Sequence, residues 1–379
     1  MVSKYDVVVI GGGIAGASVA GELAKERSVL LAEMEDQPGY HSTGRSAALF
    51  ILTYGNDIVR ALTRASRDFF YQPLGSFCTN PLVHPRAILL TAEPGMAEQL
   101  EEFLETIAPG DHFERKTVQE AVELMPILRP DAISGALFNS TLADIEVHEL
   151  HQGYLRMLKA EGGRITTNAG VSQISRTADH WVLTIGEETI HADIIVNAAG
   201  AWAGEIAGLA GAQDLGLRPL RRTVCLVAPP VDSHSEAWPM LADVADKFYL
   251  KPDAGMLLIS PSDETLSPPC DAQPDELDIA IAIDRIEQAT TLTVRRVTHK
   301  WAGLRTFAKD RSPVIGFDAL RPSFFWHAGF GGFGIQTAPA ASRLAASIIA
   351  GRQPDADIVA AGLDVDRVAP TRFTRTIAA

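Results

Sequence analysis

The sequence predicts an α/β protein that contains a parallel sheet and an antiparallel sheet. Short, continuous apolar runs at 6–10 and 29–32 are typical of parallel strands that are buried on both faces. Apolar runs bounded by turn residues, at 181–185 and 247–260, are typical of antiparallel strands. Because 379 residues exceed the size at which one core stops growing, we expect two domains or one large domain with an elaborate insertion.

The composition argues against several functional classes. Hydrophobic residues at 46% and charged residues at 21% are typical of a globular chain, and a net charge of −14 argues against nucleic-acid partners and anionic membrane surfaces. No run of about 18 apolar residues predicts a membrane span, and the N-terminus lacks a signal-peptide layout. Three scattered cysteines do not suggest a disulfide framework or a closed zinc site. We therefore expect a cytoplasmic protein without a bound metal.

A glycine motif follows the first predicted strand. Gly11, Gly13 and Gly16 stand between that strand and a helix predicted over 11–25, and Glu33 follows the second strand. The glycines permit close approach of a pyrophosphate, the helix N-terminus attracts its charge, and the acid can accept hydrogen bonds from ribose hydroxyls. This unit predicts a dinucleotide site in a Rossmann-like domain, but it does not distinguish FAD from NAD.

Later segments add both kinds of sheet. A strand at 87–92 and an acidic helix at 98–106 are interpreted as the first piece of another domain. Strands between 164 and 200 predict a small antiparallel meander that returns to the parallel sheet. Residues 223–230 and a hairpin over 247–260, turning at 252–255, predict a larger antiparallel sheet that roofs a pocket.

The C-terminal part supplies a second glycine turn. A strand at 324–328, glycines over 329–334 and a helix over 335–351 would aim another helix N-terminus at an electron-rich group. A flavin gives this dipole a purpose, because reduction places negative charge at the N1/C2=O end of its ring. We therefore expect FAD in a discontinuous domain over 1–76, 144–217 and 300–379, with a substrate domain over 77–143 and 218–299.

Several segments resemble one family of flavoenzymes. The segments VVVIGGGIAGAS, YHSTGRSAA, VNAAGAWA, DRSPVIG and GGFGIQT together resemble the D-amino-acid oxidase/glycine oxidase superfamily. The segments QPGYHSTGRSAA, LHQGYLR, FYLKPDAGMLL, ATTLTVRR and WAGLR are similar more specifically to bacterial FAD-dependent D-arginine dehydrogenases. The resemblance covers nearly the whole chain. It implies a glutathione-reductase-type FAD domain, an antiparallel-sheet substrate domain, noncovalent FAD and oxidative deamination of a D-amino acid.

The resemblance also implies contacts for substrate and cofactor. Arg305 and Arg222 match arginines that bind the substrate carboxylate, and Arg221 stands beside the latter as an alternative. Tyr54 and Tyr249 match phenols near the same carboxylate. Gln336 also resembles a residue near the substrate. The expected cofactor contacts are Gly11, Gly13, Ile14, Ala15, Gly16, Glu33, Thr43, Arg45, Ser46, Ala47, Val171, Gly200, Gly331, Gly332, Gly334, Ile335 and Gln336.

Two departures from the D-arginine dehydrogenases predict a different substrate. Ile88 stands where those enzymes carry a glutamate that holds the basic side chain, and Leu49 replaces a histidine close to the substrate amine. A guanidinium placed there would lose water without gaining a partner, whereas an apolar side chain would gain about 25 cal/mol per Å² buried. We therefore predict a substrate with a small or apolar side chain; the alternative is that Ile88 is plain core.

Three functions stay open at this point. The first is a dehydrogenase or oxidase for nonbasic D-amino acids that transfers hydride to flavin N5. The second is FAD-dependent oxidation of an N-methyl amino acid or a 2-hydroxy acid, because a carboxylate clamp does not define the group at Cα. The third is a noncatalytic flavin-containing subunit. The electron acceptor, either dioxygen or a quinone-type carrier of a respiratory chain, and the role of His327 stay open as well.

Overall fold

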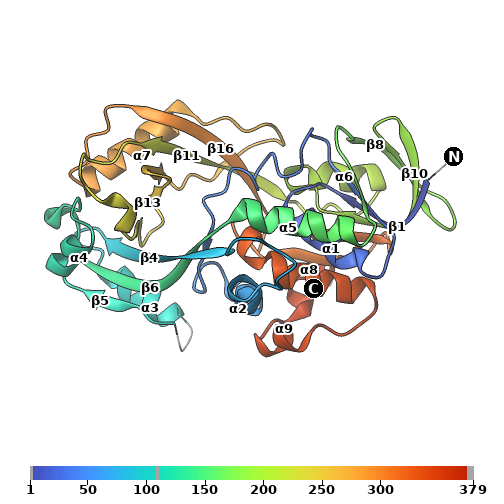
Figure 1. The fold of residues 1–379 in the computed structure, drawn as a ribbon, viewed down its shortest axis with the longest axis horizontal. Coiled ribbons are helices and arrows are strands. Elements are labelled where there is room, and N and C mark those ends of the chain that lie inside the picture. Colours follow the sequence, from blue (N-terminus) through green and yellow to red (C-terminus); the bar gives the residue numbers. More distant parts are fainter. Residues whose placement is uncertain (1–2, 108–110, 374–379) are drawn as a thin grey trace, which may run out of the picture.

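The computed structural model describes residues 3–107 and 111–373, whose strands form two sheets. The sheet with mostly parallel strands lies on the right of Figure 1, and the sheet with mostly antiparallel strands lies on the left. The predicted α/β fold with a Rossmann-like part and an antiparallel-sheet part is confirmed. Every helix in the described ranges is too short or too polar to span a lipid bilayer.

The first sheet has eight strands in the order β17-β18-β10-β1-β2-β7, and β9 and β8 extend it from β10. Five of its strands, from β18 to β7, run parallel, while the meander β8-β9-β10 is antiparallel as predicted. The strands are β1 (Ser3–Ile10), β2 (Val29–Ala32), β7 (Arg164–Thr166), β8 (Val171–Arg176), β9 (Trp181–Ile185), β10 (Glu188–Asn197), β17 (Val314–Phe317) and β18 (Phe324–Ala328).

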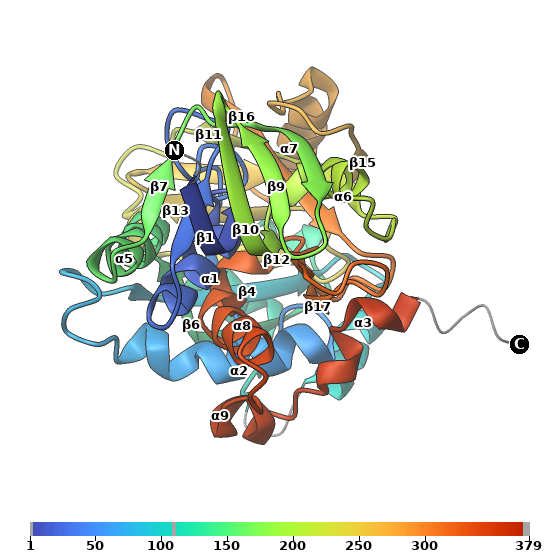
Figure 2. The same cartoon turned by 90° about the vertical axis from the view of Figure 1, so that its right-hand side faces the viewer.

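Both faces of this sheet are covered, which explains the continuous apolar strands. Val7 and Val9 face a core formed with α1 (Ile14–Ala24), α5 (Val147–Ala160) and α8 (Gly334–Ile349). Val8 and Ile10 face a second core formed with β9 and α6 (Ala203–Ala210). Outside α8 lie α2 (Asp57–Tyr71) and α9 (Ala356–Ala360), and Figure 2 shows α1 and α8 side by side on one face of the sheet.

The first helix begins later than the sequence predicts. Gly11 has a φ of +102° and Gly13 is extended, so the turn occupies the residues before Ile14 and α1 starts there. A Cβ at Gly16 would lie 1.8 Å from the carbonyl oxygen of Gly11. Because a backbone atom cannot yield to a side chain, only glycine lets the helix start directly against the end of β1.

The second sheet has ten strands in the order β15-β11-β14-β13-β12-β4-β6-β3, with β16 beside β11 and β5 beside β6. Among the described strands of this sheet, β12 and β4 are the one pair that runs parallel. Helices α4 (Val118–Leu124) and α7 (Glu276–Ala289) cover one face, and α3 (Glu98–Thr106) packs on the other. The strands are β3 (Leu49–Phe50), β4 (Val83–Ala92), β5 (Glu114–Lys116), β6 (Gly135–Ile145), β11 (Arg218–Val227), β12 (Met240–Asp243), β13 (Tyr249–Asp253), β14 (Met256–Ser260), β15 (Thr265–Leu266) and β16 (Val297–Phe307).

The turn of the hairpin β13-β14 is shorter than predicted. Asp253 pairs with Met256, so only Ala254 and Gly255 form the turn, and both have positive φ angles. Positive φ at both central residues suits the twist of a two-residue hairpin. Pro252 fits inside β13 because β12 pairs only with the two residues at the start of that strand.

Some strands run across the predicted domain boundaries. β16 pairs with β11 along its length, although the prediction divides it at 299/300. β6 likewise crosses the boundary predicted at 143/144. The division of the chain into domains therefore stays a prediction.

Candidate active site

A cavity of about 420 Å³ lies where the two sheets meet. Ile10, Ala32 and Ala328, at the carboxyl ends of three parallel strands, form part of its wall. Arg222 and Arg305, from two strands of the ten-stranded sheet, form part of the opposite wall. Ligands of open α/β sheets bind outside the carboxyl ends of the strands, so this cavity is the candidate active site.

Most of the predicted cofactor contacts line this cavity. Gly16 and Gln336 are outside the lining; Gly16 instead packs α1 against β1, and Gln336 accepts a hydrogen bond from the Ile51 amide at 3.1 Å. The predicted contacts in the lining are Gly11, Gly13, Ile14, Ala15, Glu33, Thr43, Arg45, Ser46, Ala47, Val171, Gly200, Gly331, Gly332, Gly334 and Ile335.

Two helices begin at the cavity wall. The first residue of α1, Ile14, and the first residue of α8, Gly334, both line the cavity. The Ile14 amide donates to the Thr43 hydroxyl at 2.9 Å, while the next N–H groups of α1 have no acceptor within the helix. Helix N-termini carry a partial positive charge, so both positions favour anionic groups of a ligand.

Glu33 places a buried carboxylate at the cavity wall, and its side chain is only 7% exposed. Oε2 accepts from the Gly12 amide at 2.7 Å, and Oε1 accepts from the Glu35 amide at 3.0 Å. These bonds fix the carboxylate and leave each oxygen able to accept again. A ribose hydroxyl is a suitable donor, which agrees with the role predicted from the motif.

Replacing Glu33 by glutamine is expected to raise the dissociation constant for FAD by about 10- to 100-fold, because hydrogen bonds to a charged acceptor contribute about 1.5–3 kcal/mol. Titration of the apoprotein with FAD, followed by flavin fluorescence, measures this change. The matched control is Glu35→Gln, since Glu35 contacts His41 at 2.8 Å and lies outside the lining. Equal losses in both variants would contradict a specific contact with Glu33.

Several buried polar atoms at or beside the cavity have no partner among the described residues. They are the Thr306 hydroxyl, both ring nitrogens of His327 and the amide nitrogen of Gln336. Thr306 and His327 belong to the cavity lining. Buried polar groups normally have hydrogen-bond partners, so these atoms indicate a polar ligand. The residues present therefore fit a dinucleotide that carries hydroxyl, phosphate and ring amide groups.

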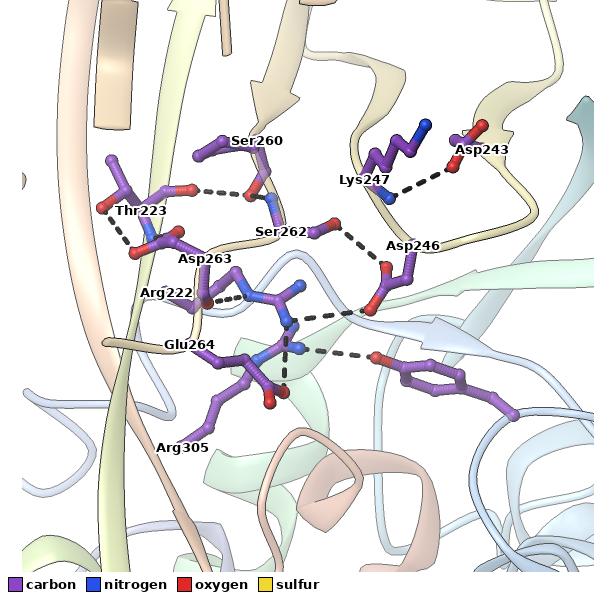
Figure 3. A network of polar contacts seen from close by, with 12 residues as sticks. Arg222, Thr223, Asp243, Asp246, Lys247, Ser260, Ser262, Asp263, Glu264 and Arg305 are labelled. Atoms are coloured by element: carbon purple, nitrogen blue, oxygen red, sulfur yellow. Dashed lines mark hydrogen bonds and ion pairs between the residues drawn. The ribbon is translucent and has the colours of Figure 1, made fainter. Parts of the chain in front are cut away.

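Arg305 supplies a partly buried cation at the cavity wall. It comes from β16, and Figure 3 shows it extending toward the same region as Arg222 of β11. Its Nη1 donates to the Tyr54 hydroxyl at 3.4 Å, a long hydrogen bond. A Cβ at Gly332 would lie 2.9 Å from the guanidinium carbon, so this cation packs directly against the turn before α8.

Arg222 is the second cation of the cavity and is 5% exposed. Its Nε donates to the Asp263 carbonyl at 2.9 Å, and its Nη2 lies 3.5 Å from Glu264 Oε1. Arg221 instead faces α7, where its Nη2 lies 2.9 Å from Asp278. The alternation of side chains along β11 therefore favours Arg222 over Arg221 as the residue of the cavity.

An acidic residue stands beside these two arginines. Glu264 forms two hydrogen bonds with Arg311, at 2.7 and 3.0 Å, and these bonds lower the pKa of its carboxyl group. Figure 3 shows Glu264 next to Arg222 and Arg305. Because Arg311 already compensates this carboxylate, the guanidinium of Arg305 can still bind the carboxylate of a substrate.

Ile88 and Leu49 belong to one apolar cluster and are outside the cavity lining. Ile88 is 7% exposed and lies beside Met240 on the neighbouring strand. Tyr249, which lines the cavity, belongs to the same cluster. This cluster therefore connects the predicted specificity positions to the cavity wall through Tyr249.

Sequence reasoning missed part of the lining, and the structure adds further contacts for Arg45. His41 and Trp202 line the cavity with their ring centroids 4.7 Å apart; both lie in quoted segments, and their aromatic character was the available signal. Arg45 lines the cavity, but its Nη1 donates to the carbonyls of Ala272 and Ala302 at 3.0 Å, and its Nη2 pairs with Asp271. Its guanidinium mainly ties distant segments together.

The fold and this cavity are typical of a dinucleotide-binding protein. The family model of FAD dependent oxidoreductases, DAO, matches residues 6–348, so the chain belongs to this family, and the predicted cofactor, FAD, is confirmed. When bound, FAD supplies an electron-pair acceptor. The residues that would hold it are those of the two helix N-termini and Glu33.

Two relatives and two solved structures illustrate the similarity. Glycine oxidase of Geobacillus kaustophilus is 22% identical over 390 residues, which cover 94% of this chain and 96% of the relative. A bovine (Bos taurus) protein, FAD-dependent oxidoreductase domain-containing protein 1, is 27% identical over 53% of this chain, which spans only 48% of that relative.

The solved structures confirm the fold. The structure of glycine oxidase from G. kaustophilus superposes with a TM-score of 0.83 at 20% identity, covering 98% of this chain and 99% of that chain. The structure of L-proline dehydrogenase from P. horikoshii superposes with a TM-score of 0.81 at 22% identity, covering 99% of both chains.

Proposed function

We propose that this protein catalyses the FAD-dependent oxidative deamination of D-amino acids with small or apolar side chains. The observation that carries the proposal is the partly buried Arg305, which shares one cavity with the dinucleotide motif and whose side chain makes, among the described residues, one long hydrogen bond, to Tyr54. A substrate carboxylate supplies the missing charge in bidentate geometry. The family membership supports the redox chemistry.

In this proposal the residues of the chain act by binding and orientation. Arg305 and Arg222 hold the carboxylate, with Tyr54 and Tyr249 beside it, so that the Cα–H bond of the substrate faces the cofactor. The hydrogen leaves Cα with its electron pair, the lone pair of the neutral amine forms the C=N bond, and the proton of the resulting iminium passes to water. The imino acid then hydrolyses to a 2-oxo acid and ammonia.

The start of α8 has an electrostatic role in the same proposal. Gly331, Gly332 and Gly334 bring this helix N-terminus to the cavity wall next to Arg305. Its N–H groups and the nearby guanidinium would hold the electron-rich part of a bound FAD and would favour negative charge there.

The side-chain preference rests on the cluster around Ile88. Ile88, Leu49 and Met240 are apolar, and they pack with Tyr249 of the cavity wall. A basic side chain would meet no carboxylate of this cluster, so D-leucine, D-methionine or D-phenylalanine should have a larger kcat/KM than D-arginine. In this proposal the chain shares its fold with the D-arginine dehydrogenases but differs from them in substrate.

Replacing Ile88 by glutamate is expected to raise kcat/KM for D-arginine and D-lysine by about 10- to 100-fold relative to the unmodified protein, because a charge-assisted hydrogen bond contributes about 1.5–3 kcal/mol. Ile88→Gln, which has nearly the same shape and no charge, is the matched control. A steady-state comparison of basic and apolar D-amino acids measures the change. The same low activity toward basic substrates in both variants would show that residue 88 does not contact the substrate side chain.

The alternatives are a substrate with another group at Cα and a protein without catalytic activity. Oxidation of an N-methyl amino acid or a 2-hydroxy acid needs the same carboxylate clamp, and the names of the relatives include a glycine oxidase and an L-proline dehydrogenase. A noncatalytic flavin subunit is the remaining candidate. A cytoplasmic location, noncovalent FAD and transfer of electrons to dioxygen or to a quinone-type carrier belong to the proposal as well.

An anaerobic substrate panel tests the proposed function. The FAD-loaded protein is mixed without oxygen with D-amino acids, L-amino acids, sarcosine or 2-hydroxy acids, and the flavin absorbance is followed. Loss of absorbance with apolar D-amino acids is expected. Reduction only by sarcosine or 2-hydroxy acids would favour the second function, and no reduction by any substrate would favour the noncatalytic subunit. Admission of air then distinguishes an oxidase from a dehydrogenase.

A further inference from the structure

His327 is a buried imidazole with unused hydrogen-bonding capacity. It lies near the carboxyl end of β18 and is 1% exposed, and neither ring nitrogen has a partner among the described residues. Burial lowers the pKa of its ring to about 3, so the ring is neutral at physiological pH. A neutral imidazole has one N–H donor and one nitrogen acceptor. Both groups are available to a ligand in the cavity.

The side chain lies on the face of the sheet that carries α1 and α8. Phe325 belongs to the core beneath these helices, and Trp326 belongs to the core on the opposite face. Because side chains alternate along a strand, His327 shares the face of Phe325. Its ring contacts Phe330 with centroids 4.9 Å apart, and a Cβ at Gly334 would lie 3.2 Å from Phe330 Cβ.

The two helix N-termini are neighbours at this place. A Cβ at Gly334 would also lie 3.8 Å from Ile14 Cγ2, so the first residues of α8 and α1 are close together. His327, Ile14 and Gly334 all line the cavity. The ring therefore lies beside Phe330, near the place where the first residues of α8 and α1 come together. With the pyrophosphate expected at α1 and the flavin ring expected at α8, this part of the wall is where the two expected sites meet.

The ribityl chain is the part of FAD that joins these two sites. Its hydroxyl groups each donate and accept a hydrogen bond, as a neutral imidazole does. A phosphate oxygen only accepts and would leave the bare ring nitrogen without a partner. We propose that His327 binds hydroxyl groups of the FAD ribityl chain and thereby fixes the path of the cofactor between α1 and α8. This inference rests on FAD in the cavity and not on the choice of substrate.

The proposal predicts opposite effects on the two forms of the protein. His327→Leu removes two buried polar atoms that lack partners in the apoprotein, so the melting temperature of the apoprotein should rise. The same change should raise the dissociation constant for FAD by about 10- to 100-fold, because two hydrogen bonds are lost. His327→Gln, whose amide retains one donor and one acceptor, should recover part of the affinity.

A comparison with FAD analogues tests the contact itself. Apoprotein of the unmodified chain and of His327→Leu is titrated with FAD and with its 2′-deoxy, 3′-deoxy and 4′-deoxy ribityl analogues, and flavin fluorescence gives each dissociation constant. For at least one analogue, the dissociation constant should be larger than that of FAD in the unmodified protein. In His327→Leu, the same analogue and FAD should have equal dissociation constants. If every analogue loses the same affinity in both proteins, the contact does not exist and a buried water satisfies the ring.

A spectroscopic measurement needs no variant. The ring ¹⁵N signals of His327 should shift when FAD binds, because a bare nitrogen gains a hydroxyl donor, and they should shift less with the analogue that lacks the contacted hydroxyl. Unchanged signals with FAD bound would overturn the proposal. None of these measurements uses a substrate, so a protein that binds FAD in this way and oxidises no D-amino acid would refute the proposed function alone. A protein that binds no FAD would refute both.

Discussion

Replacing Arg305 by leucine is expected to lower kcat/KM for the best amino-acid substrate by about 30- to 4000-fold. The estimate follows from the loss of one partner of a buried charge pair, which costs about 2–5 kcal/mol, at 1.4 kcal/mol per tenfold change. Arg305→Lys should lose less, because the charge remains while the bidentate geometry is lost. Steady-state kinetics of the FAD-loaded variants measure both changes.

The same substitution should have little effect on the stability of the protein without substrate. Arg305 is partly buried, and its Nη1 donates one long hydrogen bond, 3.4 Å, to the Tyr54 hydroxyl. Burial acts to lower the pKa of its guanidinium, but Tyr54, Tyr249 and Asp246 raise it. Leucine removes the desolvation cost of the charge together with its favourable neighbours, so the melting temperature should change little while activity falls. The FAD content should stay unchanged. A lower melting temperature together with full activity would show that Arg305 is a structural residue.

Replacing Gly16 by alanine is expected to abolish FAD binding and to lower the free energy of unfolding by about 3 kcal/mol or more. The new methyl group would lie 1.8 Å from the Gly11 carbonyl oxygen, so α1 must move away from β1. Its N-terminus would then leave the cavity wall. Chemical denaturation of the apoprotein and titration with FAD measure the two effects.

Gly208→Ala is the matched control for this change. Gly208 lies in α6, is exposed, and a Cβ there meets no atom within 4 Å. Alanine is favoured over glycine inside a helix by about 0.5–1 kcal/mol, so this variant should be slightly more stable and should bind FAD normally. Normal FAD binding by Gly16→Ala would contradict the packing role assigned to this glycine.

The cofactor side of the cavity was the more predictable half. The spacing of Gly11, Gly13 and Gly16 fixes a turn between a strand and a helix, and Glu33 follows the neighbouring parallel strand, so local sequence already determines their proximity. The strand, turn and helix near the C-terminus are equally local. The fold follows from them because apolar strands of this kind must be covered on both faces.

The substrate side depends on contacts between distant segments, which local patterns do not report. Glu264 meets Arg311 and Arg222 only because β11, β16 and the segment after β14 come together in the ten-stranded sheet. Arg45 similarly contacts the carbonyl of Ala302 far along the chain. No periodicity predicts whether such a guanidinium binds a ligand or the protein. Only the structure shows that the two ring nitrogens of His327 have no hydrogen-bond partner among the described residues.

The most direct test of the account is whether one cavity holds both FAD and a carboxylate-binding guanidinium. Titration of the FAD-loaded protein with benzoate, a simple carboxylate that cannot be oxidised at Cα, should produce a saturable change in the flavin absorbance spectrum. Arg305→Leu with the same FAD content should show little or no change at the same benzoate concentrations. A protein that takes up no FAD, or an identical benzoate response in the unmodified protein and in Arg305→Leu, would contradict the account.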